Sequence, residues 1–115
     1  MTEDDRLVRA GVRHILEGLG YEVLVATGGA EALRICEEHP GGIDLLLTDI
    51  LMPGMTGGEL AREVSARLPG VRVLFMSALP NDVLVEQGRI AEGAPSVLKP
   101  FSDEELTAAV EKLLA

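Results

Sequence analysis

The sequence is poor in several features, and each shortage excludes a class of protein. Cys36 is the only cysteine among 115 residues, so the chain can form neither an internal disulfide nor a zinc site built from cysteines. No run approaches the ~20 apolar residues that a membrane-spanning helix needs. The acidic start, Met1-Thr2-Glu3-Asp4-Asp5, is unlike a signal peptide. We therefore predict a protein of the reducing cytoplasm without a membrane partner.

Basic residues are also scarce, since 10 Lys and Arg stand against 19 Asp and Glu, for a net charge of -9. Proteins that coat nucleic acid need the opposite sign to neutralise phosphates, so no direct nucleic-acid partner is expected. Only Lys99 and Lys112 are lysines. The acidity is typical of a soluble surface, and a metal-binding cluster is the sharper alternative.

The length and composition indicate one folded domain over residues 1–115. Domains most often contain about 100–150 residues, and a chain of this size can bury a stable core without disulfides or bound metals. Hydrophobic residues make up 47% and charged residues 25%, which is ordinary for a globular protein. The chain has no internal repeat and no linker-like segment, so no domain boundary is predicted.

Short runs of aliphatic and β-branched residues alternate with segments of helical periodicity. The predicted strands are Tyr21–Ala26, Ile43–Thr48, Val71–Met76 and Ser96–Leu98. The predicted helices are Leu7–Leu19, Ala30–His39, a third that carries Leu60, Val64 and Leu68, a weaker one over Asn81–Glu92, and a last one opened by the capping box Ser102–Glu105. This alternation predicts an α/β fold with a parallel sheet covered by helices on both faces.

Functional groups of such sheets gather beyond the carboxyl ends of the strands. Asp49, Ser77 and Lys99 each follow a predicted strand, and Glu3-Asp4-Asp5 precede the first helix. Carboxylates are the hard oxygen ligands that Mg²⁺ prefers, a lysine can pair with a phosphate oxygen, and an aspartate can form an acyl phosphate. The pattern indicates a site for a divalent cation and a phosphoryl group.

These segments resemble the receiver domain of two-component response regulators along nearly the whole chain. The matching segments are Glu3–Asp5, Leu46–Gly57, Phe75–Ala78 and Ser96–Phe101. The order of Asp-Ile-Leu-Met-Pro-Gly, Ser-Ala and Lys-Pro-Phe is more specific than any one piece. The sequence of the segment Leu-Leu-Leu-Thr-Asp is similar to that of receivers attached to hybrid histidine kinases.

The resemblance implies a flavodoxin-like, three-layer fold and a phosphoacceptor module of a bacterial phosphorelay rather than a turnover enzyme. Asp49 would take a phosphoryl group from a histidine kinase or a histidine phosphotransfer protein. Ser77 and Lys99 would bind that group, and the peptide bond before Pro100 would be cis. A homodimer is a further possible partner arrangement.

The resemblance also implies a site for Mg²⁺ (or Mn²⁺). Asp4 and Asp49 would bind the ion directly, and Glu3 would lie beside it through water. The backbone carbonyl of Leu51 would complete the protein ligands. Asp5 is predicted instead to be the N-cap of the first helix.

The chain departs from the family pattern at two places. Receivers begin with a central strand before the acidic pair, whereas only Met1 and Thr2 precede Glu3. A missing or truncated first strand would leave a gap between Tyr21–Ala26 and Ile43–Thr48. The neighbouring strands could close this gap, or a partner chain could fill it. Alternatively, the sequence given is shortened at its start, and a longer sequence would supply the strand. The family also usually has Tyr or Phe where this chain has Ser96.

Three other functions remain as alternatives. The first is a degenerate receiver that acts only through protein contacts or dimerisation, which the two departures favour. The second is an aspartyl-phosphate hydrolase, which would need an aspartate at the position of Leu51. The third is a flavodoxin-like flavin carrier, which would need a Ser- and Thr-rich phosphate loop after a first strand.

Overall fold

A parallel three-stranded sheet in the order β1-β2-β3 forms the centre of the molecule. The computed structural model describes residues 1–115. The strands are β1 (Leu45–Asp49), β2 (Arg72–Ser77) and β3 (Ser96–Leu98). The helices are α1 (Arg6–Gly18), α2 (Gly29–Glu38), α3 (Gly57–Arg67), α4 (Asn81–Glu86) and α5 (Asp103–Leu114). The predicted α/β fold with a parallel sheet is confirmed.

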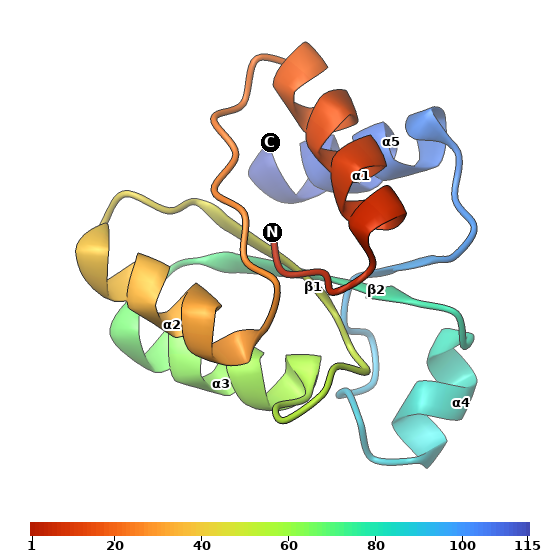
Figure 1. The fold of residues 1–115 in the computed structure, drawn as a ribbon. Coiled ribbons are helices and arrows are strands. Elements are labelled where there is room, and N and C mark those ends of the chain that lie inside the picture. The colour runs from red at the N-terminus through yellow and green to blue at the C-terminus, as the bar shows by residue number, and fades with distance from the viewer.

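The helices cover both faces of the sheet, with α1 and α5 on one side and α2 and α3 on the other (Figure 1). Leu47 and Leu74 point toward α1 and α5, whereas Leu46 packs against α2 and α3. Because successive strand residues face opposite sides, each central strand contributes to both layers and reads as a continuous apolar run. This arrangement leaves the ends of the strands free for polar groups.

Local sequence signals set most helix boundaries. The Asp5 carboxylate accepts hydrogen bonds from the backbone N–H groups of Leu7 and Val8, so the predicted N-cap of α1 is confirmed. The predicted capping box at Ser102 is present at the start of α5. The helix predicted over Asn81–Glu92 is too long: α4 ends at Glu86, since the chain turns at Gly88, whose φ of 72° favours glycine.

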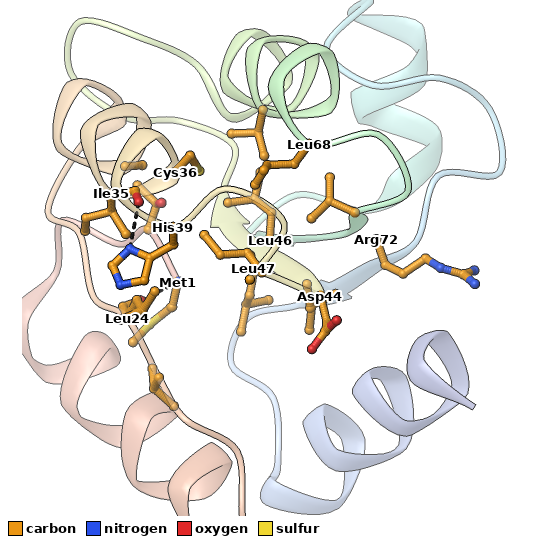
Figure 2. Close-up of a pocket in the computed structure, with 18 of the residues that line it drawn as sticks. Met1, Leu24, Ile35, Cys36, His39, Asp44, Leu46, Leu47, Leu68 and Arg72 are labelled. Atoms are coloured by element: carbon orange, nitrogen blue, oxygen red, sulfur yellow. Dashed lines mark hydrogen bonds between the residues drawn. The ribbon is translucent and has the colours of Figure 1, made fainter.

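The strand predicted over Tyr21–Ala26 is wrong as a regular strand. Ala26 alone forms a bridge, to Thr2, and the residues before it belong to no strand, although the Leu24 carbonyl accepts a hydrogen bond from the Met1 amine at 2.9 Å (Figure 2). The physical reason is that a strand needs a neighbour along its length, and only the first three residues of the chain lie beside this segment.

Residues 1–3 are the truncated first strand. The Thr2 N–H donates to the Leu47 carbonyl at 2.8 Å, and its carbonyl accepts from the Asp49 N–H at 3.0 Å. On the other side, the Met1 carbonyl accepts from the Ala26 N–H at 2.9 Å. The expectation of a missing or truncated first strand is therefore confirmed, and the neighbouring segments have not closed up.

The start of the chain lies deep in the fold, where it is costly to bury polar groups. Burial lowers the pKa of the Met1 amine to about 6, against a smaller opposing effect of Cys36. The Thr2 hydroxyl is buried without a hydrogen-bond partner. Hydrogen bonding of buried polar side chains is thus less complete at this end of the sheet than in the rest of the core.

The orphaned hydroxyl predicts that Thr2→Val stabilises the protein. An unsatisfied buried hydroxyl costs free energy that a methyl group of the same shape does not, so the gain should be about 1 kcal/mol. Thr48→Val is the matched control, because Thr48 is equally buried but its hydroxyl donates to the Asp49 carbonyl at 2.9 Å. Urea denaturation should show a higher midpoint for the first variant and a lower one for the second; a lower midpoint for both would contradict the assignment.

Candidate functional site

The carboxyl ends of the three strands bring the sequence-predicted residues to one edge of the sheet. Asp49 ends β1, Ser77 ends β2 and Lys99 directly follows β3. The register pairs Asp49 with Met76, the residue before Ser77. The Lys99 N–H donates to the Ser77 carbonyl at 2.7 Å, which fixes the start of the following loop.

The Lys99 ammonium joins two carboxylates that are far apart in the sequence. Its Nζ lies 3.0 Å from Glu3 Oε2 and 3.2 Å from Asp49 Oδ2. The other oxygen of Asp49, Oδ1, accepts a hydrogen bond from the Ile50 N–H at 3.0 Å. These contacts hold the Asp49 carboxylate at a fixed place, with its side chain only 13% exposed.

Glu3, Asp4 and Asp49 form an acidic cluster in which one carboxylate oxygen of each lies within 4.8 Å of the others. Glu3 is buried, Asp49 is half-buried and Asp4 is exposed, so the cluster opens to solvent on one side. A set of carboxylate oxygens suits a hard divalent cation such as Mg²⁺, which keeps several waters. The chemistry of the donors therefore fits that ion.

The buried charges shift the pKa values of two of these groups. Burial raises the pKa of the Glu3 carboxyl, the hydrogen bond from Lys99 opposes the shift, and the charge of Asp49 adds to it. Burial alone would lower the pKa of the Lys99 ammonium, but the hydrogen bond to Glu3 and the charge of Asp49 outweigh it and raise the pKa. Lys99 thus stays protonated and offsets part of the repulsion between the carboxylates.

Arg9 is a supporting residue that the sequence reasoning missed. Its Nη1 donates to the backbone carbonyls of Glu3, at 3.0 Å, and Asp4, at 3.3 Å. The Glu3 carboxylate also accepts from the Asp5 N–H at 3.2 Å. The sequence did contain a signal for this role, because Arg9 lies one helical turn after the N-cap Asp5. An arginine side chain at that position can reach back to the backbone of Glu3 and Asp4.

Gly57 fixes the path of the chain behind the phosphoacceptor candidate. Its N–H donates to the Ile50 carbonyl at 2.7 Å. A Cβ at this position would lie 2.2 Å from the Asp49 carbonyl oxygen and 2.9 Å from the Ile50 Cα. Only glycine lets the start of α3 approach the end of β1 this closely.

We therefore expect Gly57→Ala to destabilise the protein by about 3 kcal/mol, since backbone must move to admit the methyl group. Gly11→Ala is the matched control: Gly11 lies in α1 with nothing near its Cβ position, and alanine should stabilise that helix by up to about 1 kcal/mol. Thermal or urea unfolding of both variants measures the contrast. Equal stability of the two variants would refute the close packing at Gly57.

The remaining predicted residues lie in the loops around this edge. Ser77 is buried, and its hydroxyl oxygen accepts from the Leu79 N–H at 2.9 Å. Leu51 is exposed in the loop after β1. The Lys99–Pro100 peptide bond is cis. Ser96, on β3, donates its hydroxyl hydrogen bond to the Asn81 side chain at the start of α4.

Comparisons with known proteins agree on one family. Residues 1–111 match the response regulator receiver domain family. The chain is 33% identical to the sensor kinase CckA of Brucella abortus. The match covers 99% of this chain but only 12% of CckA. It is 34% identical to the response regulator receiver protein CpdR of the same organism, covering 99% of this chain and 93% of CpdR.

The fold has the same match among solved structures. The receiver domain from the hybrid histidine kinase CckA superimposes with a TM-score of 0.83 and 34% identity, over 99% of this chain and 95% of that domain. No helix of the chain combines the length and apolar character needed to cross a membrane. The matched region includes the acidic cluster, Ser77 and Lys99.

Proposed function

This chain belongs to the response regulator receiver domain family of two-component systems, and we propose that it accepts a phosphoryl group on Asp49. The donor would be a phosphohistidine on a histidine kinase or a histidine phosphotransfer protein. An Asp49 carboxylate oxygen forms the new bond to phosphorus while the bond from phosphorus to the imidazole nitrogen breaks. The nitrogen keeps that electron pair, so the products are an aspartyl phosphate and a neutral histidine.

The observation that carries this proposal is the placement of Lys99 between Glu3 and Asp49 at the open edge of the sheet. The Lys99 ammonium and the Ile50 N–H hold the Asp49 carboxylate in one orientation. The side of the carboxylate that these contacts leave free can then attack phosphorus. Lys99 can pair first with the Asp49 carboxylate and then with the phosphoryl oxygens, since its Nζ already lies within ion-pair distance of that carboxylate.

The acidic cluster would hold Mg²⁺ through Asp4 and Asp49, with Glu3 beside it and the Leu51 carbonyl as a further ligand. Bound there, the ion would shield the carboxylates from one another and stabilise charge on the transferring oxygens. Arg9 supports this arrangement, because it anchors the backbone of both Glu3 and Asp4.

Ser77 and the loop after it would report the modification. The hydroxyl already accepts a hydrogen bond from Leu79, which leaves its proton free to donate to a phosphoryl oxygen. Because Ser96 is bound to Asn81, a movement of the loop between β2 and α4 would be transmitted to the α4–β3 surface. That surface is the proposed place for a change in protein contacts.

The test is phosphorylation by a small-molecule phosphodonor such as acetyl phosphate, followed by intact mass. We expect one added phosphoryl group when Mg²⁺ is present and none when the metal is chelated. Labelling that persists at full rate in chelator would overturn the metal-dependent mechanism.

Metal binding itself gives an independent prediction. Asp4→Asn should weaken Mg²⁺ binding at least about tenfold, or about 1.4 kcal/mol, because a charged ligand is lost from the cluster. Asp5→Asn is the matched control, since it removes a neighbouring charge outside the cluster and asparagine still caps a helix. Titration of Mg²⁺ against amide chemical shifts measures both; equal affinities would place the ion elsewhere.

A second function, protein interaction without phosphorylation, is favoured by Ser96, which stands where the family usually has Tyr or Phe. The Ser96 hydroxyl is bound to the Asn81 side chain, so the aromatic ring that usually couples to the hydroxyl switch is absent at this position. This alternative predicts Mg²⁺-independent binding of a protein partner and no mass change with the phosphodonor, in contrast to the proposal above.

A further inference from the structure

Helix α4 is the shortest helix of the fold and is weakly built by itself. It contains six residues, and the proline before it provides no side-chain cap. An isolated helix of fewer than about 12 residues is not stable in water, so α4 depends on contacts with the rest of the chain. In Figure 1, α4 lies apart from the helices that cover the sheet. Its position is therefore set by a small number of contacts.

The side chain of Asn81, the first residue of α4, binds the chain at the start of β3. Its Oδ1 accepts a hydrogen bond from the Ser96 hydroxyl, and its Nδ2 donates to the Ala94 carbonyl at 3.2 Å. We call these two hydrogen bonds the Asn81 latch. The latch ties the first turn of α4 to the first residue of β3.

The β3 end of the latch is fixed by the sheet. Ser96 is paired with Phe75 of β2 in parallel register, and the Phe75 N–H donates to the Pro95 carbonyl at 3.1 Å. Ser96 cannot shift without loss of these ladder contacts. Any movement that breaks the latch must therefore come from its α4 end.

The α4 end of the latch is attached to the loop after Ser77. The Ser77 hydroxyl accepts a hydrogen bond from the Leu79 N–H at 2.9 Å. Pro80 joins Leu79 to Asn81, and its ring keeps its φ close to the observed −63°. Leu79 also packs against the apolar cluster that contains Leu84 of α4. A displacement of Leu79 is therefore passed on to Asn81.

We propose that the Asn81 latch opposes phosphorylation of Asp49 and that the modification breaks it. The inference rests on the proposed function, in which the Ser77 hydroxyl is drawn to a phosphoryl oxygen and carries Leu79 with it. Asn81 then moves away from Ser96, and α4 loses the contact that fixes its first turn. Asn81 and Ser96 are positioning residues, because they act through the Ser77 loop and not by touching the phosphoryl group.

This coupling must act in both directions, because the binding free energies form a closed cycle. If a bound phosphoryl group breaks the latch, then removal of the latch must favour binding of that group. A hydrogen bond of this kind changes an equilibrium by a factor of about two to ten. That factor is the expected size of the effect on affinity.

The probe is beryllium trifluoride, which binds to a carboxylate as a mimic of the phosphoryl group and gives an equilibrium affinity in the presence of Mg²⁺. We expect Ser96→Ala to bind it about fivefold more tightly than the unmodified chain. Ser96→Thr keeps a hydroxyl and should bind it like the unmodified chain. Ser65→Ala, an exposed position on α3, is the matched control and should have no effect. Equal affinities of Ser96→Ala and the unmodified chain would overturn the proposal.

A double-mutant cycle with Ser77→Ala tests the route. Without this hydroxyl, the phosphoryl mimic cannot draw the loop toward Asp49. Ser96→Ala should then give no further gain in affinity. The same gain with and without the Ser77 hydroxyl would contradict transmission through Ser77.

Hydrogen exchange gives a readout that does not require the mimic. The Leu84 N–H donates to the Pro80 carbonyl at 3.1 Å within the first turn of α4. Ser96→Ala should speed its exchange about fivefold without ligand, and the mimic should do the same in the unmodified chain. Unchanged exchange in both cases would overturn the breaking of the latch. Absence of binding by every variant would overturn the proposed function and this inference with it, whereas binding with equal affinities rejects the latch alone.

Discussion

Asp49→Asn is expected to abolish formation of the aspartyl phosphate completely. The amide lacks the anionic oxygen that attacks phosphorus, so neither a small-molecule phosphodonor nor a kinase should label the variant. The fold should be kept, because asparagine retains an oxygen that can accept from the Ile50 N–H, as Asp49 Oδ1 does. Intact mass after treatment with acetyl phosphate and Mg²⁺ measures the loss.

Asp44→Asn is the control for this prediction. Asp44 is exposed and precedes the opposite end of the same strand, so its variant should be labelled like the unmodified chain. If Asp49→Asn still accepted one phosphoryl group, the acceptor would be another residue and the assignment of this site would fail.

Lys99→Met is expected to give the largest loss of stability among changes to the charged residues of the site. The methionine removes the ammonium that lies 3.0 Å from Glu3 and 3.2 Å from Asp49, which leaves two poorly solvated carboxylates in mutual repulsion. We expect a cost of about 3 kcal/mol in chelator, at the low end of the range for breaking a buried ion pair, since the lysine side chain is 20% exposed.

Two further measurements separate this cause from simple loss of packing. Mg²⁺ should stabilise Lys99→Met more than it stabilises the unmodified chain, because the cation replaces the missing positive charge. Adding Glu3→Gln to Lys99→Met should recover part of the lost stability in chelator. Strictly additive effects of the two substitutions, together with no extra Mg²⁺ response, would contradict an electrostatic role of Lys99.

Much of this fold could be predicted from local patterns. Continuous apolar runs fixed the positions of β1, β2 and β3 to within two residues, because buried parallel strands need apolar side chains on both faces. The Asp5 and Ser102 caps were predictable because their side chains satisfy backbone groups a few residues away. Asp49, Ser77 and Lys99 could be placed at one edge for the same topological reason, although their roles stay predictions.

What could not be predicted depends on contacts between distant segments. Tyr21–Ala26 has the composition of a strand, yet its pairing requires residues beside it that the chain supplies only at Met1–Glu3. Similarly, nothing in the local sequence at Glu3 indicates that its carboxylate is buried against Lys99. The steric need for Gly57 also follows only from the approach of α3 to the Asp49 carbonyl.

The most direct test of the central claim is to locate the phosphoryl group on the unmodified chain. Treatment with acetyl phosphate and Mg²⁺, reduction of the acyl phosphate with borohydride and peptide mass mapping would identify the acceptor. The account predicts one reduced residue, at position 49, and none when the metal is chelated. Modification at another carboxylate, or an unmodified chain in the presence of Mg²⁺, would contradict it.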